Sequence, residues 1–274
     1  MNANSISVGI PFYNAENFLI DAVRSVFYQT YDHWELILLD DGSTDDSLKL
    51  AKSINDKRVR VYSDGKRKGL SSRLNEITQL SKYSFIARMD ADDLIAQNKF
   101  EKQIVILKNN SDVDLISTSF FSLDIYDNPI GKSPKYFNNF SKNELLYKKG
   151  HGIVHASIMG RKEWFCRNPY DENIQIGQDY DLWVRAAGKK DFNILTLDEP
   201  LFYYRQEMNV TLKKLIGAYE TKYRVIKRYV DKNSFYFYLK FRLKVFIIKL
   251  LDKFNLIKIL LKRRTEKLNK NEKK

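Results

Sequence analysis

The sequence predicts an α/β fold with a mostly parallel central sheet, followed by a basic helical C-terminal extension. Over roughly the first 110 residues, apolar strand-like runs alternate with stretches of helical periodicity, which is the pattern of a sheet covered by helices. Two of these runs end in neighbouring aspartates. From residue 212 onward, 20 Lys and Arg stand against 5 Asp and Glu, whereas residues 1–211 hold 27 against 29. The net charge of +13 therefore belongs to the extension, which argues against nucleic-acid binding by the α/β part.

The first two strands are expected at residues 5–10 and 34–39. The first continues through Pro11, Tyr13 and Asn14 into a helix whose apolar residues share one face. The second ends at Asp40 and Asp41, and the following Gly and Ser suit a tight turn before the next helix. Ligands of open α/β sheets bind at the carboxyl ends of the strands, so we expect both turns to line a binding site.

A third strand is expected at residues 84–89, and an acidic cluster follows it directly. Asp90, Asp92 and Asp93 repel one another at the end of a buried strand unless a cation neutralises them. Mg²⁺ and Mn²⁺ take such oxygen ligands together with diphosphate oxygens, so the cluster indicates a metal–nucleotide site. The alternative is an ordinary loop or helix N-cap, where Asp is also common. A further strand is expected at residues 112–118.

Five segments in this order and spacing resemble family 2 of the inverting glycosyltransferases, whose catalytic domain has the GT-A fold. The matching segments are SVGIPFYN (7–14), SVFYQT (25–30), LDDGSTD (39–45), RMDADD (88–93) and GQDYDLWVR (177–185). The resemblance covers about residues 5–205 and implies a nucleotide-sugar donor, most simply a UDP-sugar. It divides the chain into a nucleotide-sugar-binding half (1–110), an acceptor-binding half with the catalytic base (111–211) and the extension (212–274).

The resemblance also implies roles for the donor-binding residues. Pro11, Tyr13 and Asn14 would lie around the nucleotide base, and Asp41 would accept a hydrogen bond from it, which suits the N3–H of uracil. Asp90 would contact the ribose or support the metal. Asp92 would coordinate Mn²⁺ or Mg²⁺, and Asp93 would share either task.

One donor-site position departs from the family pattern. Where relatives often have Arg-Asn, this chain has Leu74 and Asn75, so only the nucleotide contact of Asn75 carries over. Arg73 or the basic run at residues 66–68 could supply the missing cation, although such a run is also typical of a solvated loop.

The catalytic base implied by the resemblance is Asp179, with Gln178 in place of the usual Glu. Asp181 is an alternative base. Positions two apart in a helix face different sides, so only one of the two is expected to reach the substrate. A direct displacement inverts the anomeric centre without a covalent intermediate, and no nucleophile pair is evident in the sequence.

Further candidates follow from weaker matches. His155 lies in the segment where the acceptor site begins, and it is either an acceptor or diphosphate contact or a structural histidine. Arg205 suits a diphosphate because its fork of donors matches phosphate oxygens. Glu207 stands where relatives have a His, and it either joins the metal site or only closes the fold.

The extension reads as amphipathic helices over residues 212–230 and 243–261 with Lys and Arg beside the apolar stripe, which suits an anionic membrane surface. The alternatives are packing on the catalytic part or a homodimer interface. No stretch is long and apolar enough to span a membrane, no signal peptide is evident, and the single Cys166 agrees with a reducing compartment. We therefore expect a cytoplasmic protein, peripheral on the inner face of the membrane.

Together these observations predict a metal-dependent transferase that adds a sugar to a glycan or lipid-linked acceptor in bacterial surface polysaccharide synthesis, lipopolysaccharide or capsule. A catalytically silent glycan- or membrane-binding protein is the alternative from another class. A sugar nucleotidyltransferase fits less well, because residues 9–14 form no Gly-rich phosphate loop.

Overall fold

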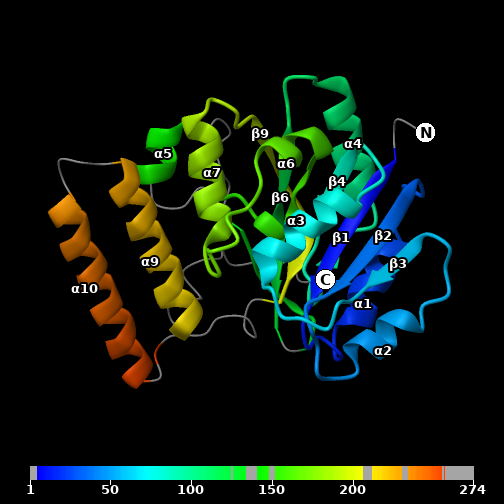
Figure 1. Cartoon of the computed structure of the whole chain (residues 1–274), viewed down its shortest axis with the longest axis horizontal. Coiled ribbons are helices and arrows are strands. Elements are labelled where there is room, and N and C mark those ends of the chain that lie inside the picture. The colour runs from blue at the N-terminus through cyan, green and yellow to red at the C-terminus, as the bar shows by residue number, and fades with distance from the viewer. Residues whose placement is uncertain are drawn as a thin grey trace.

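A computed structural model describes residues 5–124, 126–133, 141–147, 152–205, 212–229, 234–254 and 256. It is a mixed α/β structure with a curled sheet and two C-terminal helices beside it (Figure 1). The strands are β1 (Ile6–Phe12), β2 (Trp34–Asp40), β3 (Val59–Tyr62), β4 (Phe85–Arg88), β5 (Leu94–Ile95), β6 (Leu115–Leu123), β7 (Pro129–Lys132), β8 (Met159–Arg161) and β9 (Ile194–Tyr204). The helices are α1 (Leu19–Phe27), α2 (Ser47–Lys52), α3 (Leu70–Leu80), α4 (Lys99–Asn109), α5 (Lys142–Tyr147), α6 (Lys162–Arg167), α7 (Gln178–Gly188), α9 (Leu212–Tyr229) and α10 (Ser234–Lys253), with a 3₁₀ turn at His155–Ser157.

Four strands of the nucleotide half are parallel, in the order β3-β2-β1-β4. β1 and β2 are buried over their whole length, as expected for apolar runs covered on both faces. Their register pairs Ile6 with Trp34 and Phe12 with Asp40. The turns that follow β1, β2 and β4 therefore lie at one edge of the sheet, and the predicted α/β fold class is confirmed.

The rest of the sheet mixes directions. β8 runs antiparallel between β4 and β6, and β9 is parallel to β6 but antiparallel to β5. β9 shifts register against β6 between Thr118 and Phe120. One continuous sheet thus crosses the division expected near residue 110.

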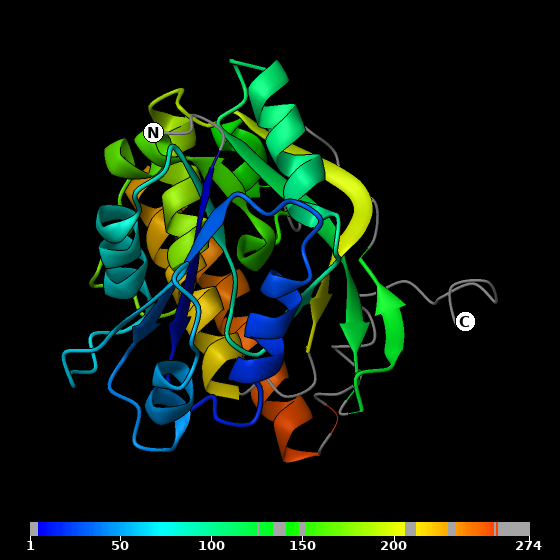
Figure 2. The ribbon, with the colours of Figure 1, turned by 90° about the vertical axis from the view of Figure 1, so that its right-hand side faces the viewer.

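Helices cover both faces of the sheet (Figure 2). Apolar residues of α1 and α4 form one core cluster with alternate residues of β1 and β2. Residues of α3, α6 and α7 form another, in which the Trp164 and Trp183 rings lie 6.0 Å apart. These layers fix the strand ends rigidly.

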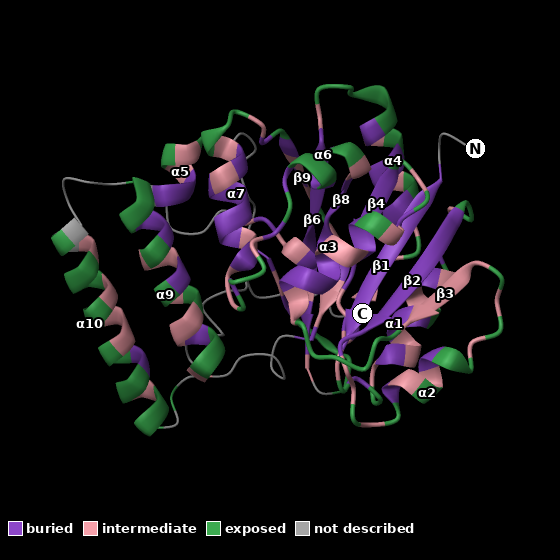
Figure 3. Ribbon diagram, viewed as in Figure 1, coloured by how far each residue is buried: buried purple, intermediate pink, exposed green. Residues whose placement is uncertain are grey.

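The C-terminal helices form a further layer outside α7. Leu215, Thr221, Val225 and Ile226 of α9 are buried, and α9 contacts α7, whereas α10 contacts α9 (Figure 1). Figure 3 shows that exposed residues dominate α10. None of the described helices is long and apolar enough to cross a membrane.

Candidate active site

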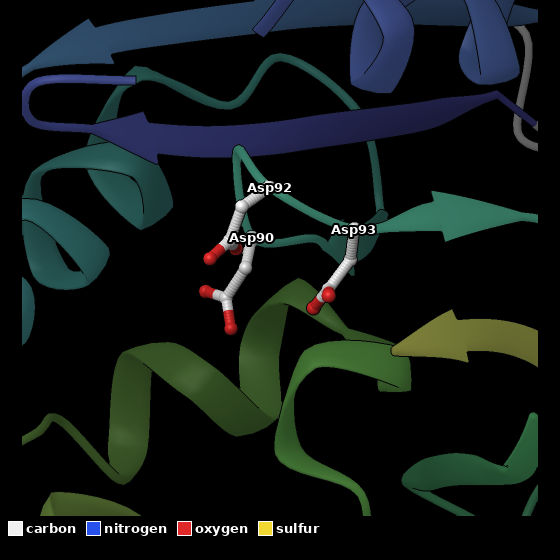
Figure 4. Close-up of side chains that lie close together, drawn as sticks. All are labelled: Asp90, Asp92 and Asp93. Atoms are coloured by element: carbon white, nitrogen blue, oxygen red, sulfur yellow. The ribbon is translucent and has the colours of Figure 1, made fainter. Parts of the chain in front are cut away.

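The acidic loop after β4 brings three carboxylates together. Oxygen atoms of Asp90, Asp92 and Asp93 lie within 4.8 Å of one another, and Figure 4 shows the three side chains pointing to the same side of the loop. Asp93 is fully buried. Its Oδ1 accepts a hydrogen bond from the Arg205 backbone N–H at 3.0 Å, whereas its Oδ2 has no hydrogen-bond partner among the described residues. A buried carboxylate oxygen without a partner is costly, so this oxygen suits a cation.

The electrostatics of this loop agree with an excess of negative charge. Burial, followed by the charges of Asp92 and Asp90, holds the pKa of Asp93 well above its ordinary value. Burial also raises the pKa of Asp90, and the Arg88 guanidinium, 2.6 Å from the Asp90 Oδ1, opposes this shift only in part. Three clustered carboxylates are a donor set that fits a hard divalent cation.

Arg205 supports the acidic loop from β9. Its side chain is buried and donates twice to the Asp127 carboxylate, both at 2.6 Å, and once to the Asp92 carbonyl at 2.8 Å. The bidentate pair ties the loop to the turn between β6 and β7. The Arg205 side chain therefore holds the acidic loop in place. It does so with the same N–H donors that we expected to bind a diphosphate. Glu207, the other candidate of this segment, lies outside the described residues.

The acidic pair after β2 is in a different electrostatic state. Asp40 accepts from the Ser43 N–H and the Ser63 hydroxyl. Asp41 accepts from the Lys68 and Gly69 N–H groups at 2.8 and 3.0 Å and from the Arg73 Nε at 3.0 Å.

Arg73 is itself enclosed. Only 1% of its side chain is exposed, and it also pairs with Asp64 at 2.7 Å and Glu76 at 2.8 Å. Its guanidinium is thus committed to three carboxylates, and Lys68 of the basic run is likewise paired, with Asp64 at 2.8 Å and Glu76 at 2.6 Å.

The candidate base-binding residues lie beside Asp41 at the end of β1. Pro11 is buried within β1, whereas Tyr13 is half-buried and its ring stacks on the Arg67 guanidinium at 3.6 Å. Asn14 has a left-handed backbone (φ 48°), and its side-chain oxygen accepts from the Thr44 N–H at 2.8 Å. The turns after β1 and β2 are thereby joined, with a flat ring at their surface.

Asn75 connects α3 to the segment that precedes α7. Its amide accepts from the Tyr170 N–H at 2.9 Å and donates to the Tyr170 carbonyl at 3.1 Å. It also donates to Glu172. The polar groups of Asn75 therefore hold residues 170–172 in place, and the nucleotide contact that the resemblance implied stays a prediction.

The two candidate bases on α7 have opposite environments. Asp181 is buried and paired with Arg185 at 2.6 Å and with Arg228 of α9 at 3.3 Å. Asp179 is half-buried, and its charge contributes to raising the pKa of Asp90, so it faces the acidic loop. Gly177, with φ +78°, sets the start of the helix and leaves no room for a larger side chain against Thr221.

Two residues that the sequence did not single out belong to this site. Tyr170 is buried, and its hydroxyl lies 2.7 Å from the His155 Nε2, while the His155 ring meets Trp183 edge-on at 5.8 Å. Burial raises the Tyr170 pKa, with Asp179 and Asp90 adding to the shift. The second is Arg88, whose only sequence signal is a cation within an apolar strand. His155 thus reaches the site through Tyr170.

Several proteins of known or inferred activity are similar to this chain. It is 31% identical over 235 residues to WfgD of Escherichia coli, a UDP-Glc:α-D-GlcNAc-diphosphoundecaprenol β-1,3-glucosyltransferase, and the match covers 84% of this chain and 81% of that protein. It is 28% identical to the E. coli O-antigen biosynthesis glycosyltransferase WbnJ, over 84% of this chain and 90% of that protein. Against an uncharacterised glycosyltransferase of Rickettsia conorii the identity is 30%, but the chain spans only 39% of that protein.

Solved structures agree on the fold. The S. aureus TarS fragment 1–349 superposes with a TM-score of 0.62 at 15% identity, over 85% of this chain and 68% of that fragment, and it is also known in complex with UDP-GlcNAc. The mannosyltransferase PcManGT of Pyrobaculum calidifontis, in complex with GDP-Man and Mn²⁺, gives a TM-score of 0.58 at 13% identity, over 80% of this chain and 64% of that chain. These neighbours are GT-A glycosyltransferases, as the resemblance implied. The family model described as Glycosyl transferase family 2 matches residues 7–167, more than half of the sequence, and the chain therefore belongs to that family.

Proposed function

We propose that the chain is an inverting, metal-dependent glycosyltransferase that moves a sugar from a UDP-sugar to a glycan or lipid-linked acceptor. The observation that carries this proposal is the juxtaposition of three clustered carboxylates at the end of β4 with Asp179 on α7. The three carboxylates suit a metal-bound diphosphate, and Asp179 suits proton removal from an acceptor hydroxyl.

Asp92 and Asp93 would hold Mn²⁺ or Mg²⁺, with Asp90 beside them. The buried, unpartnered Oδ2 of Asp93 supports this assignment. When bound, the ion would supply positive charge against the departing diphosphate. Arg88 keeps Asp90 oriented, and Arg205 fixes the acidic loop through its hydrogen bond to the Asp92 carbonyl.

The uridine assignment depends on Asp41 and Tyr13. Gly69 is the only described residue that donates to the Asp41 Oδ2, at 3.1 Å, so this oxygen retains capacity to accept the N3–H of uracil. The ring of Tyr13 offers a stacking surface. WfgD is named for UDP-Glc and TarS was solved with UDP-GlcNAc, which support UDP, whereas PcManGT was solved with GDP-Man.

Asp179 would act as the base in a single displacement. It would take the proton of the acceptor hydroxyl as that oxygen attacks the anomeric carbon, while the bond to the nucleoside diphosphate breaks. Attack from the face opposite the leaving group inverts the configuration. Two Arg side chains neutralise Asp181, which supports Asp179 over Asp181.

The acceptor would bind in the half formed by residues 111–211, and the donor in residues 1–110. The relatives named for an undecaprenol-linked substrate and for O-antigen synthesis support a lipid-linked acceptor at the cytoplasmic face of the membrane. We assign the enzyme to surface polysaccharide synthesis on these grounds.

Calorimetric titration with UDP, GDP and CDP, each with and without Mn²⁺, tests the donor part of the proposal. We expect binding of UDP only with the metal, and loss of this binding in Asp92→Asn. Asp46→Asn is the matched control, because Asp46 is exposed in the turn after β2 and pairs only with Lys49 at 3.8 Å among the ion pairs of the described residues. A preference for GDP or CDP would overturn the role of Asp41. Absence of any nucleotide binding would favour a catalytically silent glycan- or membrane-binding protein.

A further inference from the structure

Helix α10 has two apolar faces, and the described residues cover only one of them. On the inner face the Phe241 ring stacks on Tyr223 of α9 at 5.2 Å, and Ile248 is only 4% exposed. At 100° per residue, the opposite face carries a second apolar row, which we name the outer stripe. Its members are Phe235, Leu239, Leu243, Phe246, Ile247, Leu250 and Phe254.

The outer stripe is exposed to an unusual degree. Leu243, Phe246 and Phe254 are 59%, 63% and 60% exposed. Exposed large apolar side chains elsewhere in the described chain, such as Tyr28 and Val105, stand far apart in sequence, whereas those of α10 follow one another along one helix face. A contiguous apolar patch of this kind marks an interaction surface rather than ordinary surface scatter.

Cations border the outer stripe on both sides. Helical spacing places Arg242 and Lys249 along one border and Lys240 along the other, whereas the Lys244 Nζ lies 5.0 Å from the centroid of the Tyr219 ring on α9. Asp252 is the only acid within α10. Burial, together with the charges of Lys244 and Lys240, lowers the pKa of the neighbouring Lys222 on α9, which agrees with a local excess of positive charge.

We propose that the outer stripe of α10 docks on an anionic lipid surface, with its apolar side chains among the acyl chains and its bordering Lys and Arg at the phosphate headgroups. An amphipathic helix lying in the plane of the interface has this distribution of apolar and cationic side chains. The inference is independent of the donor chemistry proposed above.

Other occupants complement the outer stripe less well. A second copy of α10 packed on this face would set Lys and Arg borders against Lys and Arg borders, because α10 has a single acid. Residues 257–274 are also predominantly basic, so they repeat the sign of the charge instead of opposing it. Anionic headgroups satisfy both the apolar and the electrostatic requirement.

The inner contacts connect this surface to the active site. Thr221 of α9 packs on Gly177 and donates to the Ile176 carbonyl at 2.6 Å, immediately before Asp179. A Cβ on Gly217 of α9 would lie 2.7 Å from the Ile176 side chain, so the two segments are in close contact. Docking through α10 would therefore orient the active-site edge relative to the lipid surface that carries the acceptor.

Co-sedimentation of the full chain with phosphatidylcholine vesicles, with and without phosphatidylglycerol, tests the inference. We expect binding to the anionic vesicles only. The double variant L243E/F246E should bind about tenfold more weakly or worse, because it places two charges among the acyl chains. The matched control is Val105→Glu, which places the same charge at an apolar, 49% exposed position of α4 and should leave binding unchanged. R242Q/K249Q should weaken binding about fivefold for each cation removed.

Three results would overturn the inference: no binding of the wild-type chain to either vesicle, equal binding to neutral and anionic vesicles, or undiminished binding by L243E/F246E. A dimer in vesicle-free solution that L243E/F246E converts to monomer would assign the outer stripe to a second copy. UDP titration of L243E/F246E separates the two proposals, since donor binding should persist when vesicle binding is lost.

Discussion

Two acidic turns at neighbouring strand ends look alike in sequence and differ in charge balance. After β2, Asp41 accepts from two backbone N–H groups and from Arg73. After β4, Asp93 keeps a buried oxygen without a hydrogen-bond partner among the described residues, in a cluster served by Arg88. Backbone N–H groups and Arg73 balance the charge of the first turn, whereas the second keeps an excess of negative charge. The balance of charge around an aspartate, more than its place after a strand, therefore separates a structural carboxylate from a candidate cation site.

Asp179 and Asp181 on α7 show the same contrast in charge balance. Substituting Asp179 gives the largest expected effect, on the transfer rate. Asp179→Asn should lower the transfer rate by about 10²–10⁴-fold, the usual contribution of a general base, while Mn²⁺-dependent UDP binding persists. Asp181→Asn should instead lower the melting temperature, because it leaves Arg185 and Arg228 without their shared carboxylate, and keep the rate per folded molecule. Steady-state kinetics with thermal unfolding of both variants would distinguish them. An equal loss of rate in both would remove the distinction that we draw between the two carboxylates.

Substitution of Arg73 tests whether ion pairs stabilise the turn after β2. Arg73→Met should reduce the free energy of unfolding by about 3–5 kcal/mol, because it strands Asp41 beside Asp64 and Glu76. Arg67→Met removes an exposed cation from the preceding loop and should change stability by less than about 0.5 kcal/mol. Urea unfolding measures both. A small effect of Arg73→Met would show that backbone donors alone suffice for Asp41.

Substitution of Lys99 tests whether the lack of a hydrogen-bond partner is by itself enough to indicate a binding site. It is fully buried in α4, its Nζ has no hydrogen-bond partner among the described residues, and burial lowers its pKa to about 7. No cluster of like charges surrounds it in the way that Asp90 and Asp92 surround Asp93. Lys99→Met should therefore raise stability at pH 7 by about 1–3 kcal/mol and leave the transfer rate unchanged.

The pH dependence of this effect has a definite sign. Between the folded pKa of about 7 and the ordinary value of 10.5, the unfolded chain binds more protons at Lys99 than the folded chain does. The contribution of Lys99 to stability thus rises with pH across this window and is constant below it. Urea unfolding from pH 7 to 10 should show a smaller rise in Lys99→Met than in the wild type. Matching slopes would contradict the lowered pKa.

The smallest effect is expected from Asp93→Asn. Removing one buried negative charge should stabilise the metal-free chain by about 1–2 kcal/mol, since the Arg205 N–H still has an oxygen to bond. The rise in melting temperature on adding Mn²⁺ should disappear at the same time. Differential scanning calorimetry with and without Mn²⁺ checks both effects. Destabilisation by this substitution would place Asp93 with Asp41 among the structural carboxylates.

Much of the fold was predictable because it depends on local patterns. The apolar runs of β1, β2 and β4 and the acids after them fixed the parallel block and its binding edge. β8 was not foreseen, since three residues carry no periodicity, and neither was the full extent of β9, which runs through Asp198, Glu199 and Pro200.

The candidate site was predictable in its carboxylates and less so in its cations. A sequence does not say which acid an arginine will meet. Arg73 reaches Asp41 and Arg205 reaches Asp127 across long stretches of chain. Arg205 was expected at a diphosphate, and Arg73 was one of two alternatives for the missing donor-site cation. Tyr170 carried no signal, because its place beside His155 depends on the packing of the segment that Asn75 holds.

The antiparallel pairing of β5 with β9 has a consequence during synthesis. Leu94 pairs with Tyr203, and the following Arg205 supplies the N–H bound by Asp93. At about 5–20 residues per second, a ribosome delivers these partners roughly 5–20 s after β5 itself. Until then the nascent chain has an unpaired edge at β5, beside an acidic loop that lacks its hydrogen bond from Arg205. A chaperone that binds nascent chains would meet this unpaired edge at that stage.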